Sequence, residues 1–294
     1  MRLKYWIQAF RPKTLTAAVV PVIATTALVW VAEIEIKWWI SGMALLASLC
    51  IQIGTNLVND VVDFRKGTDG HDRLGPQRVT QAKIFSEKQV WIAAAISFGL
   101  ALVCGIPLVI HGGVPILVIG LLSIFFGYAY TGGPFPLAYW GLGDLFVIIF
   151  FGLVPVLGLG YLLTGEWMKE AVVLGLQIGF HCAILIAVNN LRDVESDRRA
   201  GRKTVPVVFG VNWAKFIIML FIWIPYLLGI YWLSALEHWG TLLPLLTLPL
   251  AILLMWNIFA THPSSTYNKY LGQAALLHLS YGLLTAMGFI VCRL

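Results

Sequence analysis

Apolar runs of about 20 residues recur along this chain and are separated by short charged windows. A helix of that length, at ~1.5 Å per residue, crosses the ~30 Å hydrocarbon core of a bilayer. Only 12% of the 294 residues are charged and 59% are hydrophobic, whereas soluble domains carry about 25% charged residues. Strands of a membrane barrel would alternate over ~10 residues instead. The chain is therefore predicted to be an all-α, polytopic membrane protein.

Nine membrane-spanning helices are predicted, and we expect them to surround a central cavity. No linker or low-complexity stretch divides the chain, so residues 1–294 are interpreted as a single domain. Residues 3–10 precede the first span and are predicted to form a short interfacial helix. The predicted spans are 14–32, 38–62, 89–110, 114–130, 142–163, 170–191, 213–236, 240–261 and 271–292.

The basic residues predict how the chain is oriented in the membrane. With the N-terminus in the cytoplasm, only Lys37, Lys169 and Arg293 of the 20 lysine and arginine residues fall on the opposite side. Cytoplasmic loops carry an excess of Lys and Arg, so we expect a cytoplasmic N-terminus. The net charge of +6 comes from these loops and does not predict nucleic-acid binding.

Two polar motifs with the same spacing lie at the predicted cytoplasmic ends of the second and sixth spans. Both contain the pattern Asn-(Asp or Asn)-x-x-Asp, which starts at Asn59 in the first and at Asn189 in the second. Residues four apart share one face of a helix, so Asn59 is predicted to line up with Asp63. The second row continues from Asn189 through Asp193 and Asp197. The two rows are expected to face each other across the cavity.

The residue types in these rows favour a metal–diphosphate site. Carboxylates in a row repel one another and lose hydration at the membrane edge, so a cation should offset them. Carboxylate and carboxamide oxygens suit Mg²⁺, which binds one or two carboxylates together with substrate phosphates. Bases can neutralise the remaining phosphate charge. The basic residues that accompany the two motifs are Lys66, Arg73, Arg78, Arg192, Arg198, Arg202 and Lys203.

Further motifs follow in a fixed order along nearly the whole chain: 11–15 (RPKTL), 59–69 (NDVVDFRKGTD), 75–81 (GPQRVTQ), 130–134 (YTGGP), 141–144 (GLGD) and 189–204 (NNLRDVESDRRAGRKT). Together they resemble the UbiA superfamily of intramembrane prenyltransferases. Within it the sequence is most similar to the 1,4-dihydroxy-2-naphthoate prenyltransferases of menaquinone biosynthesis. Gly67 with the later Asp69, and the loop 131–133 without a base, resemble this branch rather than the 4-hydroxybenzoate branch.

The resemblance implies transfer of a polyprenyl group from an all-trans polyprenyl diphosphate to 1,4-dihydroxy-2-naphthoate, with decarboxylation to demethylmenaquinone. It implies a Mg²⁺ cofactor and an active site at the cytoplasmic face of a bacterial plasma membrane. We expect catalytic Asp63, Asp193 and Asp197. The implied metal ligands are Asn59, Asp63, Asp69, Asn189, Asp193 and Asp197. The implied diphosphate contacts are Lys66, Arg73, Arg78, Tyr130 and Lys203, and the acceptor contacts are Lys13 and His71.

Two other functions are compatible with this pattern. The same fold and chemistry could serve another acceptor, such as homogentisate, 4-hydroxybenzoate, a tetrapyrrole or a lipid. A cation-coupled transporter also needs intramembrane acids, but it usually holds them near the midplane rather than at helix ends among bases. A scaffold without catalysis would not need two matched acidic rows. The oligomeric state is not predicted.

Overall fold

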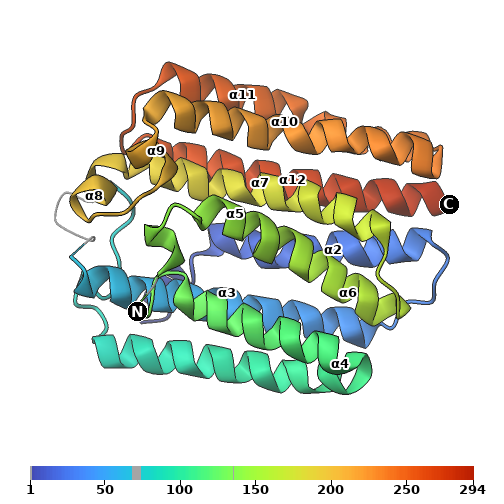
Figure 1. Ribbon diagram of the computed structural model, residues 1–294, viewed down its shortest axis with the longest axis horizontal. Coiled ribbons are helices and arrows are strands. Elements are labelled where there is room, and N and C mark those ends of the chain that lie inside the picture. Colours follow the sequence, from blue (N-terminus) through green and yellow to red (C-terminus); the bar gives the residue numbers. More distant parts are fainter. Residues whose placement is uncertain (1, 68–73, 135) are drawn as a thin grey trace.

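Long helices run side by side in one bundle (Figure 1). The computed structural model describes residues 2–67, 74–134 and 136–294, and over these ranges it contains helices and no strands. The all-α prediction is confirmed. The helices are α1 (Arg2–Phe10), α2 (Pro12–Val31), α3 (Trp38–Arg65), α4 (Glu87–Ala129), α5 (Gly143–Ile148), α6 (Val154–Thr164), α7 (Lys169–Arg192), α8 (Val194–Arg199), α9 (Val205–Val208), α10 (Val211–Leu236), α11 (Leu248–Ala260) and α12 (Tyr267–Arg293), with 3-10 turns at Leu137–Tyr139 and Trp239–Thr247.

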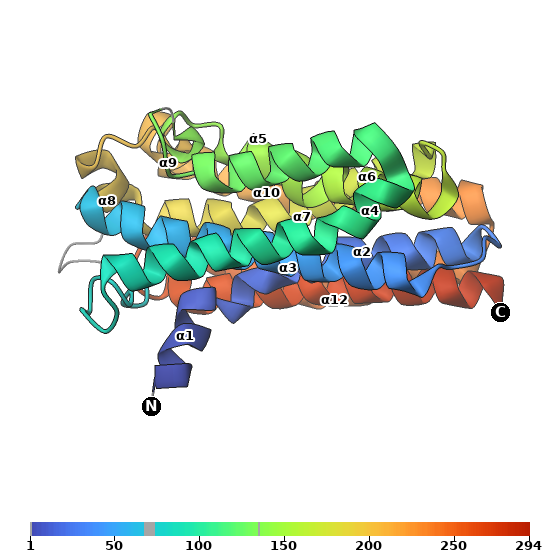
Figure 2. The same ribbon diagram turned by 90° about the horizontal axis from the view of Figure 1, so that it is seen from below.

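The predicted spans agree with these elements. Within the described ranges, eight helical stretches are long and apolar enough to cross a membrane. One of them, the 43-residue α4, contains Gly113 with φ of 70°, a backbone conformation that favours glycine. Figures 1 and 2 show that α4 turns back on itself, so it holds both predicted spans 89–110 and 114–130. With α4 counted twice, the described residues pass along the bundle nine times, in agreement with the prediction of about nine spans.

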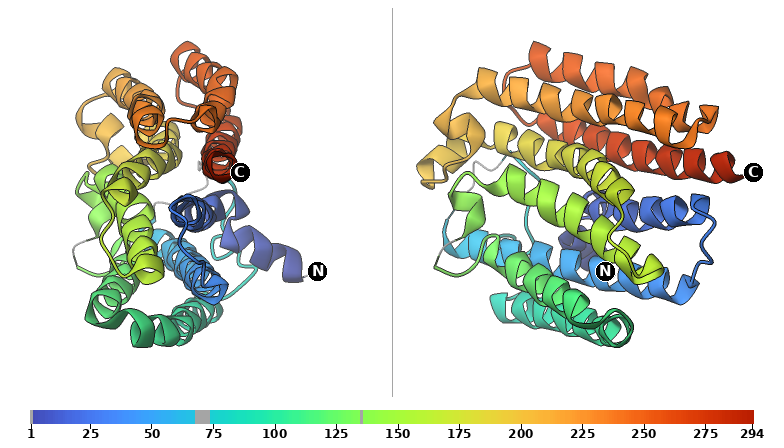
Figure 3. Two further views of the ribbon diagram at one scale, coloured as in Figure 1. Left: turned by 90° about the vertical axis from the view of Figure 1, so that its right-hand side faces the viewer. Right: turned by 45° about the vertical axis from the view of Figure 1, so that its right-hand side comes forward.

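The helices differ in how deeply they are buried. In the most apolar 18-residue stretch of α7, 72% of the residues are buried, whereas 17% are buried in the corresponding stretch of α4. Seen along the bundle, α10, α11 and α12 form one side and α3 and α4 the other, with α2 and α5–α7 between them (Figure 3). The peripheral α4 therefore offers its apolar residues to lipid, whereas α7 joins the two sides of the bundle.

One end of the bundle carries most of the polar structure. α1 leaves the bundle there at a steep angle, and α8 and α9 lie at the same end (Figure 2). Leu3 and Ile7 of α1 are exposed, as expected of a helix that lies in the membrane interface. This is the end that the basic residues predict to face the cytoplasm, and that orientation stays a prediction.

α5 and α6 form one continuous rod with a widened turn in the middle. Pro155 has no backbone N–H to donate, and the N–H of Val154 bonds to the carbonyl of Ile149, so the turn Ile149–Leu153 is a π-helix. α7 packs against this rod so closely that the backbones of the two come into contact. A Cβ on Gly179 would lie 2.6 Å from the carbonyl oxygen of Ile148, and one on Gly152 would clash with the backbone of Gly175. Glycine at these positions lets α7 pack directly against the rod.

Replacing Gly179 by alanine should therefore lower the stability of the bundle. Overpacking typically costs ~1–3 kcal/mol, which corresponds to a melting temperature several degrees lower. Gly99→Ala in α4 is the matched control, because no atom lies within 4 Å of the position that a Cβ would take there. Thermal unfolding in detergent should show a loss for Gly179→Ala only; equal melting temperatures would contradict this packing.

Candidate active site

The first polar row lies on the last turns of α3 and is buried. Asn59 and Asp63 share a face and are 9% and 3% exposed. Asp60 is buried as well and accepts a hydrogen bond of 3.1 Å from the backbone N–H of Thr80. Thr131, in the loop after α4, donates its hydroxyl to Oδ1 of Asn59. This hydrogen bond fixes the orientation of the Asn59 amide. Asp60 thus anchors a loop, while the Asn59 and Asp63 side chains face the interior.

The second row is carried by two helices rather than the single one predicted. α7 ends at Arg192, and Asp193 has φ of −96° and ψ of 13° at the bend before α8. The backbone N–H of Asp197 still bonds to the carbonyl of Asp193 at 2.8 Å. Asn189 and Asp193 therefore end α7, whereas the buried Asp197 belongs to α8. The row is bent, but it remains on one side.

A guanidinium group joins the two rows. Nη2 of Arg202 binds Oδ1 of Asp63, and its Nη1 lies 3.4 Å from Oδ1 of Asp197. Arg78 binds the other oxygen of Asp63 at 3.0 Å. The rows thus meet at one place, as predicted. Arg202 is the residue that the sequence analysis missed as a site residue, because its spacing does not separate it from the neighbouring arginines of the same segment.

A second guanidinium holds Asp193. Nε and Nη2 of Arg192 bind its two carboxylate oxygens at 2.8 and 2.6 Å, and Nη1 donates to Oδ1 of Asn268 at 2.8 Å. Asn268 lies at the start of α12 and donates to the carbonyl of Leu74 at 2.7 Å. This chain of contacts links the end of α7 to the loop that follows α3.

Burial and charge oppose each other at this site. Burial by itself lowers the pKa of Arg202, but the carboxylates of Asp63 and Asp197 outweigh it and hold the pKa above its ordinary value. Burial raises the pKa of Asp197 to about 7, although Arg202 acts in the opposite direction. Burial, followed by the charge of Asp144, raises the pKa of Tyr130, so this hydroxyl keeps its proton and can donate it in a hydrogen bond.

Both rows line one polar cavity of about 370 Å³, whose wall also includes Arg78, Arg202 and Tyr130. A second, mostly apolar cavity of about 280 Å³ adjoins it in the bundle between α2, α3, α4 and the α5–α6 rod. The two cavities share part of their walls, and the shared residues form the boundary, here called the neck, between a charged chamber and an apolar one. These residues are Arg11, Thr14, Asn59, Tyr130, Ile186 and Asn189.

The other predicted site residues have different positions. Lys13 lines the polar cavity. Lys66 and Lys203 do not line it, and their contact with a diphosphate stays a prediction. The ammonium of Lys66 lies 4.1 Å from the ring centroid of Tyr139 and donates to the carbonyl of Thr131, and that of Lys203 lies 5.2 Å from the ring of Trp140. Cation–π contacts with the loop before α5 thus draw both side chains away. Asp69, His71 and Arg73 lie outside the described residues.

The donors in the polar cavity fit a hard divalent cation. They are carboxylates and carboxamides, and a guanidinium already takes the place of a cation between Asp63 and Asp197. Within the described part of the chain, no three Asp, Glu, His or Cys side chains come close enough to hold a metal ion by themselves. Mg²⁺ commonly completes its coordination with substrate phosphates and water, so this donor set suits an ion that is bound together with a diphosphate.

Known proteins are similar to this chain in both sequence and fold. Residues 18–280 match the UbiA prenyltransferase family. The 1,4-dihydroxy-2-naphthoate octaprenyltransferase of Escherichia coli is 33% identical over 259 residues, which cover 85% of this chain and 83% of the relative. The enzyme of that name from Mycobacterium tuberculosis is 36% identical over 210 residues, 70% of each chain.

Two solved structures are similar in fold at low sequence identity. A UbiA homolog from Aeropyrum pernix superposes with a TM-score of 0.71 at 16% identity, covering 95% of this chain and 98% of the other. A UbiA homolog from Archaeoglobus fulgidus, bound to DMAPP and Mg²⁺, gives 0.63 at 15% identity and covers 96% and 99%. With a family match over most of its length and the motif-bearing helix ends gathered around one cavity, this chain belongs to the UbiA prenyltransferase family.

Proposed function

We propose that this protein transfers a polyprenyl group from an all-trans polyprenyl diphosphate to 1,4-dihydroxy-2-naphthoate, with decarboxylation, to give the hydroquinone that dioxygen then oxidises to demethylmenaquinone. The observation that carries the proposal is the junction of two cavities. A charged chamber with both acidic rows adjoins an apolar one, and a prenyl diphosphate has the same division into a charged head and an apolar tail. The relatives named 1,4-dihydroxy-2-naphthoate octaprenyltransferase support the choice of acceptor.

The acidic rows are the proposed place for Mg²⁺ and the diphosphate. The oxygens of Asn59, Asp63, Asn189, Asp193 and Asp197 would hold the ion, and Asp69 belongs to the proposed ligands on sequence alone. When bound, Mg²⁺ supplies positive charge that stabilises the diphosphate as a leaving group. A fold neighbour bound to DMAPP and Mg²⁺ is in keeping with this assignment.

The protein side chains would act on the head group from several directions. Arg78 and Arg202 each place a guanidinium in the polar cavity, where they can bind phosphate oxygens with two donors. Tyr130 stands at the neck, and its protonated hydroxyl is a donor for the oxygen that bridges the head and the prenyl carbon. Fixed donors aimed at developing negative charge lower the barrier to its formation.

The bond changes follow from this arrangement. The allylic C–O bond breaks, and the diphosphate departs with the electron pair. A ring carbon of dihydroxynaphthoate attacks the prenyl carbon, and the carboxylate on that ring carbon leaves as CO₂, which restores the aromatic ring. The apolar cavity keeps water from the electron-poor prenyl carbon until the new C–C bond has formed.

The tail sets where the reaction occurs. Each buried CH₂ contributes about 0.8 kcal/mol, so a long prenyl chain stays in the bilayer while its head stays at the membrane surface. We propose that residues 1–294 form one domain in a bacterial plasma membrane, with the polar cavity open to the cytoplasm. Basic residues at this end of the bundle support that orientation.

Turnover can be tested with purified protein in detergent. Dihydroxynaphthoate, a polyprenyl diphosphate and Mg²⁺ should yield pyrophosphate and a prenylated naphthohydroquinone, which air oxidises to the naphthoquinone that liquid chromatography detects. EDTA should stop the reaction and excess Mg²⁺ should restore it. Homogentisate and 4-hydroxybenzoate, offered with the same donor, should react much more slowly. Preference for either of them would overturn the proposed acceptor while leaving the prenyl transfer in place.

Single amide variants should test the acidic rows. Asp63→Asn and Asp193→Asn remove one charge each with little change in volume, and we expect each to lower kcat by about 10²–10³-fold. Glu195→Gln is the matched control, because this acid is exposed and pairs with Arg198 outside the cavity. Size-exclusion profiles should be unchanged in all three. Near-normal turnover of both aspartate variants would rule out the site assignment.

A further inference from the structure

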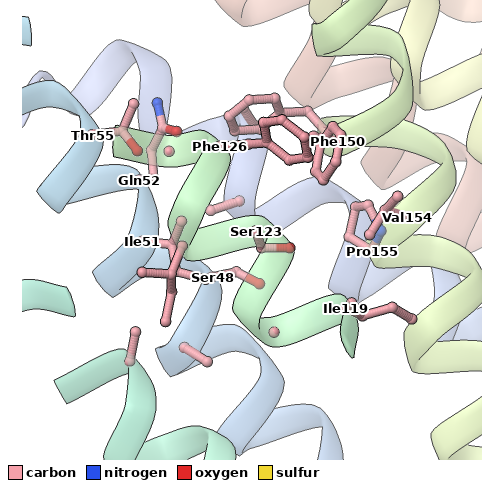
Figure 4. A pocket seen from close by; sticks show the side chains of 18 of the residues that line it. Ser48, Ile51, Gln52, Thr55, Ile119, Ser123, Phe126, Phe150, Val154 and Pro155 are labelled. Atoms are coloured by element: carbon pink, nitrogen blue, oxygen red, sulfur yellow. The ribbon is translucent and has the colours of Figure 1, made fainter. Parts of the chain in front are cut away.

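Polar side chains lie deep in the apolar cavity, away from the acidic rows. Ser48, Gln52 and Thr55 on α3 and Ser123 on α4 line it, and Figure 4 shows them around one space. Gln52 is only 7% exposed, and its Oε1 has no hydrogen-bond partner among the described residues. The proposed steps of prenyl transfer give these polar side chains no role.

An isoprenoid tail does not explain this polar patch. A buried polar group without a partner is costly in an apolar environment, and a hydrocarbon has no group to offer it. The remaining wall of this cavity is largely aliphatic or aromatic. A ligand that satisfies Gln52 must therefore carry its own polar hydrogen at this depth.

The depth of Gln52 agrees with the place of the second substrate. Gln52 precedes Asn59 by seven residues on the same helix, which is about 10 Å along its axis. A nucleophile approaches the prenyl carbon opposite the departing diphosphate, at a contact of ~3–3.5 Å. If the head lies at Asn59, the attacking ring lies deeper in the cavity, beside Thr55 and Gln52.

Aromatic side chains complete the surroundings of that space. The rings of Phe126 and Phe150 face it (Figure 4), with centroids 5.0 Å apart. Phe146 stacks on Phe150 at 4.3 Å and supports it from the side. Such rings favour offset or edge-to-face contacts with another aromatic ring. One side of the space is therefore suited to an aromatic ring, and the other to the polar groups on that ring.

We propose that Gln52, with the hydroxyls of Ser48 and Ser123 beside it, binds the aromatic acceptor and positions it for attack. The inference rests on the proposed function and names the place of its second substrate. A ring hydroxyl of the acceptor donates to Oε1 of Gln52, and the ring packs against Phe126 and Phe150. Gln52 is thus a specificity-determining residue for hydroxylated aromatic rings.

The direct test is Gln52→Leu, which keeps the volume but removes both polar atoms. We expect the KM for dihydroxynaphthoate to rise about tenfold, the effect of one lost hydrogen bond, with the KM for prenyl diphosphate unchanged. Ser97→Ala is the control in the same bundle, since Ser97 bonds to the carbonyl of Ala93 and lines neither cavity. A parallel rise in both KM values, or no rise in either, would overturn the inference.

Binding without turnover separates this inference from the proposed reaction. Dihydroxynaphthoate is titrated into Mg²⁺-free protein, and tryptophan fluorescence reports the Kd. It should be about tenfold weaker for Gln52→Leu. The analogues 1-hydroxy-2-naphthoate and 4-hydroxy-2-naphthoate each lack one ring hydroxyl. The analogue that lacks the hydroxyl bound by Gln52 should bind the wild type as weakly as dihydroxynaphthoate binds Gln52→Leu. Its Kd should not rise further in the variant. Equal Kd values for both proteins, or no binding to the wild type, would contradict the inference even if prenyl transfer occurs.

Discussion

The contact of Arg202 with Asp63 and Asp197 is the interaction on which the site depends. It joins the end of α3 to α8, two segments that are far apart in the sequence. Two buried carboxylates of like charge repel each other and have lost hydration, so a cation between them stabilises the pair. A positive charge at this point therefore holds the two halves of the bundle around one cavity. A metal–diphosphate complex would meet the same electrostatic need with the same oxygens.

The fold explains why an apolar chamber adjoins this junction. α7 is fixed against the α5–α6 rod by backbone contact at Gly179, and α3 carries its polar face from Asp63 down to Ser48 along the opposite wall. Tyr130 and Asn59 lie where the charged and apolar chambers meet. In the proposed reaction, one helix face would provide oxygens for the head group, and an amide deeper in the cavity would lie beside the reacting ring.

Local sequence patterns were enough to predict much of this arrangement. Apolar run length predicted the spans, and the four-residue spacing predicted that Asn59 and Asp63 share a face, because both depend on helix geometry alone. The bridging role of Arg202 depends on the path of the chain after α8, which spacing does not encode. Lys66 and Lys203 turn toward Tyr139 and Trp140 through tertiary contacts with a distant loop. Gln52 shares a helical face with Asn56 and Asn59, but its spacing does not show that its Oε1 lacks a partner until the cavity around it is known.

The proposed function requires both rows to bind one diphosphate through shared divalent ions. The most direct measurement is an experimental structure with Mn²⁺ in place of Mg²⁺ and a non-reactive prenyl thiodiphosphate, in which anomalous scattering locates the metal. The account predicts Mn²⁺ at ~2.0–2.6 Å from oxygens of Asp63 and of Asp193 or Asp197, with the diphosphate between the rows and Arg202 turned onto it. Metal bound to one row alone, or a diphosphate outside the polar cavity, would contradict it.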